Sequence, residues 1–208
     1  MMNYVENELK IRDFWSWFLK NENQFKEVKD AKAAIEALNN QILSFGLFSW
    51  EIGEGNEKPY YLAISPNNDK NRLRLSKMIV DLAPDLPDWE FYFTKKPIEW
   101  DFILEMYDPF GIKQSYNTAD WEYTLIEKPN GKIDLHIFAE NIHALDMEDQ
   151  LIGADVAVIR IIGEENRINY VEAIKLVIDF EPEQEEYVYY LTDLKAEFDD
   201  LFKDVIIS

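Results

Sequence analysis

Apolar positions recur at helical spacing in several segments of the chain, with polar residues between them. In the first such segment the apolar stripe consists of Leu9, Phe14, Trp17 and Phe18. Asp30 is a candidate N-cap for the second segment, because its side chain can accept from backbone N–H groups. The predicted helices cover residues 6–20, 30–45, 70–83, 147–162 and 191–202.

Elsewhere the apolar positions alternate with a period of two residues, which is typical of β-strands. The predicted strands cover residues 47–52, 60–64, 89–93, 123–127, 133–138, 167–171 and 174–179. Turn residues separate two pairs of these strands, and the dipeptide Asn130-Gly131 is a strong hairpin signal. The sequence therefore predicts an α+β fold in which helices flank mostly antiparallel sheet hairpins.

Residues 147–162 fit both patterns. Acidic residues near their start favour a helix N-terminus, whereas the β-branched run from Val156 favours a strand. Because Leu151, Ala154 and Val158 keep helical spacing, we predict a largely buried helix.

The length of 208 residues fits one large domain or two small ones. Seven glycines and eight prolines give no sign of a long flexible linker. Residues 97–120 show the least regular pattern. We expect a single α+β domain over residues 1–208, with a two-lobed organisation and a boundary near 97–120 as the alternative.

The chain contains no cysteine, which excludes disulfides, thiol catalysis and thiolate zinc sites. Its first residues show no basic segment followed by an apolar run, so we expect no signal peptide. No stretch reaches the about 18 to 20 apolar residues that a membrane-spanning helix needs. Together these observations predict a cytoplasmic protein.

Acidic side chains outnumber basic ones by 41 to 21, for a formal net charge of −20. Residues 105–208 carry 24 acidic and 8 basic side chains, and so hold most of the excess. Such a surface repels phosphate backbones and anionic lipids, so we expect neither nucleic acid nor membrane as a partner. It attracts a basic protein, although the simpler interpretation is that the charge serves solubility.

Two stretches resemble an uncharacterised group of acidic bacterial proteins that is described as a domain of unknown function. One comprises residues 61–65, 82–93 and 96–97, and the other ends in Ile161-Ile162-Gly163-Glu164. The resemblance covers about a third of the chain and implies an α+β fold with a helix at 147–162. It departs at Val156, Val158 and Ile159, where leucine and alanine are commoner. It supplies no catalytic residues.

The two histidines are the first candidates for chemistry. In an alternating strand His136 lies beside Asp134 on the face that we expect to be exposed. A metal site would combine His136 and His143 with Asp146, Glu148 and Asp149. That spacing matches no established motif such as H-E-x-x-H, so we predict no metal and no other cofactor.

Other catalytic signatures are missing from the sequence. It contains no G-x-S-x-G, no phosphate-binding G-x-x-x-x-G-K-[ST] and no G-x-G-x-x-G. The adjacent acids Glu164 and Glu165 are better interpreted as an exposed turn than as a catalytic carboxylate pair. We therefore assign no catalytic residues and lean towards a non-enzymatic protein.

The clearest candidate site is an acidic patch with tyrosine anchors near the end of the sequence. Its predicted binding residues are Glu181, Glu183, Glu185, Glu186, Tyr187, Asp199 and Asp200. Tyrosine is enriched at interface hot spots, and the acids would pair with arginine or lysine of a partner. The simpler interpretation is a solvated loop and helix face.

Three functions follow as hypotheses. The favoured one is a non-catalytic protein-binding module, immunity-like or accessory, that engages a basic partner. The first alternative is an enzyme with a dispersed carboxylate and histidine site, with or without a metal. The second is a structural domain that oligomerises through aromatic residues of the first helix, because Trp15 and Trp17 are not expected to face the same core.

Overall fold

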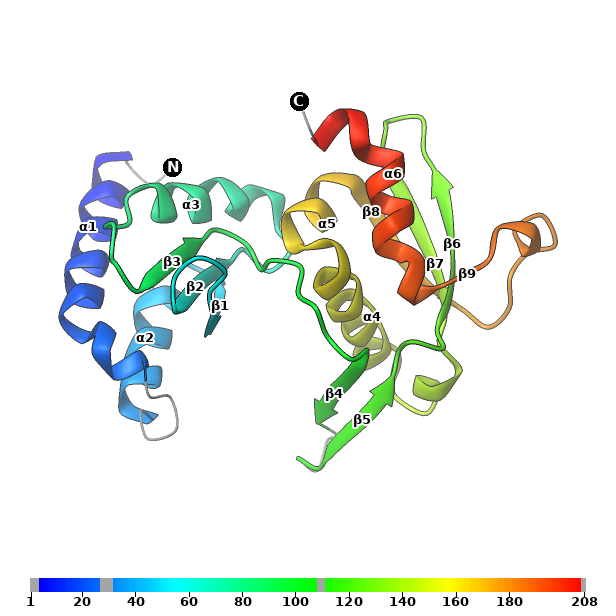
Figure 1. Cartoon of the computed structure of the whole chain (residues 1–208), viewed down its shortest axis with the longest axis horizontal. Coiled ribbons are helices and arrows are strands. Elements are labelled where there is room, and N and C mark those ends of the chain that lie inside the picture. Colours follow the sequence, from blue (N-terminus) through cyan, green and yellow to red (C-terminus); the bar gives the residue numbers. More distant parts are fainter. Residues whose placement is uncertain (1–3, 27–31, 108–110, 207–208) are drawn as a thin grey trace. The chain divides into compact units, whose positions relative to one another are not determined.

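The computed structural model describes residues 4–26, 32–107 and 111–206, and within this range it describes no side chains for residues 4–6, 185 and 204–206. The described residues form six α-helices and three β-sheets, which confirms the α+β class (Figure 1). The chain divides into two compact units, Met1–Lys95 and Lys96–Ser208. Each unit has its own hydrophobic core.

The first unit packs three α-helices against a three-stranded sheet. The helices are α1 (Tyr4–Asn21), α2 (Lys32–Leu43) and α3 (Lys70–Asp81), and the strands are β1 (Ser49–Glu54), β2 (Tyr60–Ser65) and β3 (Trp89–Tyr92). The sheet order is β1-β2-β3. β1 and β2 form the predicted antiparallel hairpin, whereas β3 lies parallel to β2 after the crossover through α3. The predicted N-cap Asp30 lies outside the described residues.

The core of the first unit is rich in aromatic rings. Phe18 of α1 stacks on Phe25 and meets the rings of Trp89 and Phe91 edge to face. The buried face of α1 consists of Ile11, Phe14, Trp15 and Phe18. These positions follow i, i+3, i+4, i+7, the spacing of one helix face.

Two predictions for α1 are wrong. Leu9 is 60% exposed, because the buried stripe begins at Ile11 instead. The indole of Trp15 is buried and donates to the Ile79 carbonyl at 2.7 Å, and Trp17 is half-buried against Phe25. Both tryptophans therefore pack against one core, which removes the expected exposed indole.

The second unit contains a hairpin, a four-stranded sheet and three α-helices. The hairpin pairs β4 (Ile103–Tyr107) with β5 (Lys113–Asn117), and the sheet consists of β6 (Glu122–Glu127), β7 (Ile133–Phe138), β8 (Val171–Val177) and β9 (Tyr189–Tyr190) in the order β8-β7-β6-β9. The helices are α4 (Met147–Ile162), α5 (Glu164–Tyr170) and α6 (Leu194–Ile206). α4 and α6 lie on one side of the sheet, and the connection between β8 and β9 lies on the other (Figure 1).

The hairpin and helix predictions for residues 123–162 are confirmed. β6 and β7 pair antiparallel around the turn at Asn130-Gly131, where Gly131 adopts a φ of 75°. Residues 147–162 form α4, whose N-cap Asp146 accepts from the Asp149 N–H at 2.9 Å. Small and branched residues of α4, including Ala154 and Val158, are fully buried.

Three features of the second unit differ from prediction. The irregular region 97–120 contains the β4–β5 hairpin, which was missed because β5 is almost wholly exposed and has no apolar alternation. The strand predicted at 167–171 is the end of α5. Arg167 bonds Asp155 of α4 at 2.8 Å, a tertiary contact that stabilises this short helix. Glu164, predicted in an exposed turn, is 1% exposed because α5 continues directly from Gly163.

Candidate functional site

The acidic residues chosen from the sequence lie on opposite faces of the four-stranded sheet. α6 packs through Phe198 into the core that also contains Leu135 and Ile137. Because side chains alternate along a strand, His136 points to the other face, where Gln184 contacts it. Asp199 and Asp200 on α6 are therefore separated by the sheet from the acids at 181–186 (Figure 1).

Residues 178–188, here called the acidic segment, connect β8 to β9. Its glutamates 181, 183 and 186 are exposed, and Tyr187 is 56% exposed. None of these three glutamates takes part in an ion pair within the described part of the chain. The side chain of Glu185 lies outside the described residues. The segment thus presents uncompensated negative charge beside an exposed aromatic ring.

The acids on α6 are in a different state. Asp199 pairs with Lys195 one turn earlier, and Asp200 pairs with Lys203 at 2.9 Å. In an exposed pair of this kind the lysine neutralises the aspartate, and the pair adds little to the stability of the fold. Of the predicted binding residues, those at 181–187 therefore lie together in the acidic segment, apart from Asp199 and Asp200. Tyr190, which follows at the end of β9, is 54% exposed and adds a second tyrosine ring.

A buried polar cluster lies on the same sheet face as the acidic segment. Asp134 is 3% exposed, which corrects the expectation of an exposed pair on β7. Its Oδ2 accepts from Lys128 at 3.0 Å and from Lys175 at 3.2 Å. The half-buried His136 has its Nδ1 3.4 Å from the Gln184 amide nitrogen. The acidic segment packs on this face of the sheet. The alternating pattern of β7 could not reveal this long-range packing, and so it did not predict that Asp134 is buried.

Two atoms of this cluster have no hydrogen-bond partner among the described residues: Asp134 Oδ1 and His136 Nε2. Burial lowers the pKa of His136, the nearby Lys175 ammonium lowers it further, and Asp134 opposes both. Burial alone would raise the pKa of Asp134, but the two lysine hydrogen bonds outweigh it and lower that pKa. At neutral pH the cluster therefore holds a carboxylate and a neutral imidazole beside the two lysines.

The metal hypothesis finds no arrangement to support it. No group of three or more His, Asp or Glu side chains is placed to hold a metal ion in residues 4–26, 32–107 and 111–206. His143 is exposed and its ring meets Phe138 edge to face at 5.8 Å. The lysines beside Asp134 also disfavour a cation there, because like charges repel.

In the first unit, sequence reasoning missed a carboxylate held inside a turn. Glu90 of β3 accepts from the backbone N–H groups of Glu57 and Lys58 and from the hydroxyl of Tyr92. Burial alone would raise the pKa of Glu90, but these hydrogen bonds outweigh it and lower the pKa to about 2. Burial and the hydrogen bond to Glu90 raise the pKa of Tyr92 to about 12. Every donor here comes from the chain, so this is a structural clamp on the β1–β2 turn.

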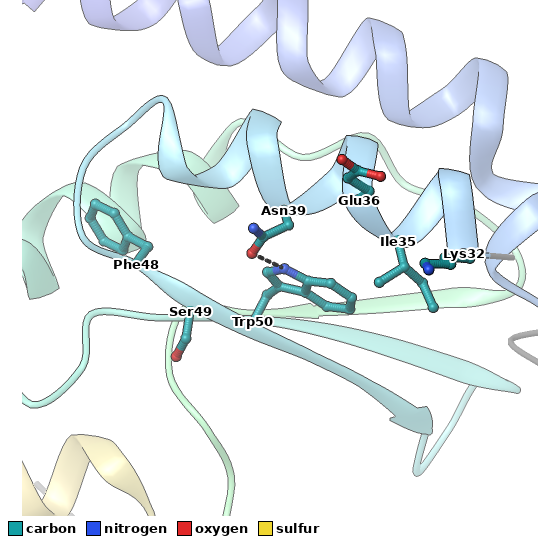
Figure 2. A pocket seen from close by; sticks show the side chains of 7 residues that line it. All are labelled: Lys32, Ile35, Glu36, Asn39, Phe48, Ser49 and Trp50. Carbon is teal, nitrogen blue, oxygen red and sulfur yellow. Dashed lines mark hydrogen bonds between the residues drawn. The ribbon is translucent and has the colours of Figure 1, made fainter. Parts of the chain in front are cut away.

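Two hollows on the protein surface have a mostly apolar lining. One, of about 430 Å³, lies beside Trp100, whose ring stacks on Phe102 and lies 4.7 Å below the Arg160 guanidinium. The other, of about 760 Å³, is a groove between α2 and β1 that Trp50 partly fills (Figure 2). The sequence offered only a weak hint of the second, since Ile35 is an apolar residue within the predicted helix 30–45, and the structure leaves it half-buried.

Comparison of the chain with protein-family models, curated proteins and solved structures gives no match. The resemblance to the uncharacterised group of acidic proteins therefore stays a prediction. Within the described residues, no helix has the length and apolar character needed to cross a membrane.

Proposed function

We propose that this chain is a non-catalytic protein-binding module that engages a basic partner through the acidic segment and the tyrosines beside it. The observation that carries the proposal is the set of exposed carboxylates at 181, 183 and 186, none of which has an ion-pair partner in the described residues. Charges that the fold does not use for itself are available to a partner.

Charge and ring placement support the same function. Residues 96–208 hold 26 acidic and 9 basic side chains, so the field around this unit steers basic proteins towards it. Tyr187 and Tyr190 are more than half exposed, and tyrosine provides contact area at low entropic cost. An immunity-type protein that covers the positive cleft of a toxin is the concrete form of this proposal.

The test is affinity capture of the tagged protein from lysate of its native host, followed by mass spectrometry at low and at high salt. The variant Glu181→Gln/Glu183→Gln/Glu186→Gln removes three charges from the acidic segment. The matched control Asp13→Asn/Glu57→Gln/Asp81→Asn removes three exposed charges from the first unit. We expect a basic protein to be retained by wild type and control, lost by the variant and released by salt, because salt screens exposed charges. Equal retention by both variants would refute the proposal.

One observation favours the alternative of an enzyme. Buried polar atoms normally have partners, and unpartnered ones occur at catalytic sites among other places. His136 Nε2 and Asp134 Oδ1 are such atoms, on one sheet face. If the basic partner proves absent, metabolite turnover by wild type and by His136→Gln is the next comparison, and equal turnover would remove this alternative.

A further inference from the structure

The groove between α2 and β1 lies in the first unit, and nothing in the proposed function uses it. It is lined by Lys32, Ile35, Glu36, Asn39, Phe48, Ser49 and Trp50. The four residues from α2 follow i, i+3, i+4, i+7, so they form one face of the helix. Figure 2 shows this face above β1, with the indole ring of Trp50 between the two elements.

The apolar part of the groove is held in place before any ligand arrives. The Trp50 Nε1–H donates to Asn39 Oδ1 at 3.3 Å, which fixes the ring against α2. Trp50 and Ile35 are both half-buried, so each keeps apolar surface open to the groove. A volume of about 760 Å³ is enough for one or two large side chains.

The strand that borders the groove is an edge strand. β1 is the outer member of the order β1-β2-β3, and its register with β2 runs unbroken from Ser49 opposite Ser65 to Glu54 opposite Tyr60. In an antiparallel pair, alternate N–H and C=O groups point away from the partner strand. Within the described residues, the backbone of 49–54 makes no hydrogen bond on that outer side.

β1 has few of the devices that protect an edge. It has six residues, no proline, no lysine and no bulge, and its only charged residues are Glu51 and Glu54, whereas proteins usually shorten, charge or bend such strands. An outward row of backbone donors and acceptors is complementary to one kind of ligand, another extended chain. Side chains of an added strand alternate, so every second one would face the groove.

We propose that an extended segment of a partner protein adds to the free edge of β1 and inserts a bulky apolar side chain between Ile35 and Trp50. Backbone hydrogen bonds supply affinity in this mode, and the groove supplies the preference for the inserted side chain. Lys32 and Glu36 at the rim are exposed and belong to no ion pair in the part of the chain that the structure describes, so they select for charged residues that flank the insert. This site is independent of the acidic segment and stands if that proposal fails.

The test selects binders to the full chain from a phage-displayed library of linear peptides. Synthetic copies of the selected peptides are then titrated against the protein, with tryptophan fluorescence as the readout. Ile35→Arg places a charge in the groove, and Asn39→Arg does so from an exposed position in case the first variant folds poorly. Leu9→Arg, at a 60% exposed leucine of α1, is the control for adding an arginine to a helix. Circular dichroism checks that each variant is folded.

We expect both groove variants to weaken peptide binding by about tenfold or more and Leu9→Arg to leave it unchanged. Hydrogen exchange should show that bound peptide protects the amides of residues 49–54. Failure to select any peptide, or peptides that bind all variants alike and leave β1 unprotected, would overturn the proposal. A concentration-dependent dimer that Ile35→Arg abolishes would also overturn it, because β1 would then pair with a second copy of the chain.

Discussion

The two units each hold a hydrogen-bonded carboxylate, Glu90 in the first and Asp134 in the second, and they do so in contrasting ways. Glu90 in the first unit has no ion-pair partner among the described residues, yet it accepts from two backbone N–H groups through one oxygen and from a tyrosine hydroxyl through the other. Asp134 in the second unit has two lysines on one oxygen and, within the part of the chain that the structure describes, no hydrogen-bond partner on the other. Counting ion pairs alone would rank Asp134 as the more important residue for stability.

The physical difference lies in what each carboxylate satisfies. Removing Glu90 takes away the common acceptor of two backbone N–H groups of one turn and of the Tyr92 hydroxyl, and hydrogen bonds to a charged group are among the stronger ones. Removing Asp134 leaves two lysines whose side chains are 35% and 53% exposed and can turn to water. The contrast teaches that a carboxylate which holds several donors of one turn in place can matter more to stability than one that pairs with two lysines free to turn to water.

The largest effect is expected for Glu90→Ala. We predict a loss of about 2–4 kcal/mol in the free energy of unfolding, because several donors of the β1–β2 turn lose their common acceptor. Urea denaturation at pH 7 measures it, and Glu57→Ala, an exposed acid on the same turn, is the control. A cost smaller than that of Asp134→Ala would break the comparison.

A smaller effect is expected for Asp134→Ala, about 1–2 kcal/mol. This lies below the cost usual for breaking a buried pair, because both lysines can rehydrate. Asp200→Ala, which breaks an exposed pair on α6, should change stability by less than about 0.5 kcal/mol. If the two substitutions prove equal in urea denaturation, Asp134 does not act as a buried charge.

The subtlest expectation is that acid weakens the two units in separate pH ranges. The folded pKa of His136 is lowered, so the unfolded chain takes up a proton first and stability falls as the pH drops below about 6.5. The folded pKa of Glu90 is about 2, so its contribution is lost as the pH falls from about 4.5 towards 2.

Urea midpoints measured across pH separate the two ranges. His136→Gln should flatten the upper range and leave the lower one, and Glu90→Ala should do the reverse. A wild-type profile that is flat between pH 7 and pH 5.5 would show that His136 is not held in its neutral form.

Local signals explain which parts of the fold were predictable. Asn130-Gly131 specifies the β6–β7 hairpin because Gly131 accepts a positive φ, and helical spacing identified α4 against a β-branched run. β5 gave no alternating apolar pattern because its side chains are exposed to solvent on both faces, apart from the half-buried Tyr116. α5 was misread because its stability depends on Arg167 meeting Asp155, twelve residues earlier, which no local window contains.

The candidate site was predictable only in its charge. The acidic segment could be located because a run of glutamates without bases does not enter a core. That Asp199 lies on the opposite side of the sheet depends on which strand faces are covered, and so does the burial of Asp134. These facts come from the β7–β8 and β6–β9 pairings, which link distant parts of the chain.

The short strand β9 also sets the order in which the second unit is completed during synthesis. Strand β6 pairs with β7 early, but its other edge waits for Tyr189 and Tyr190, and the core waits for Phe198 and Phe202 of α6. Until those residues have left the ribosome, the nascent chain exposes both an open strand edge and an unfilled core, the conditions under which unfinished chains aggregate. β9 and α6 thus complete the second unit, and a ribosome that stalls before them leaves an aggregation-prone intermediate.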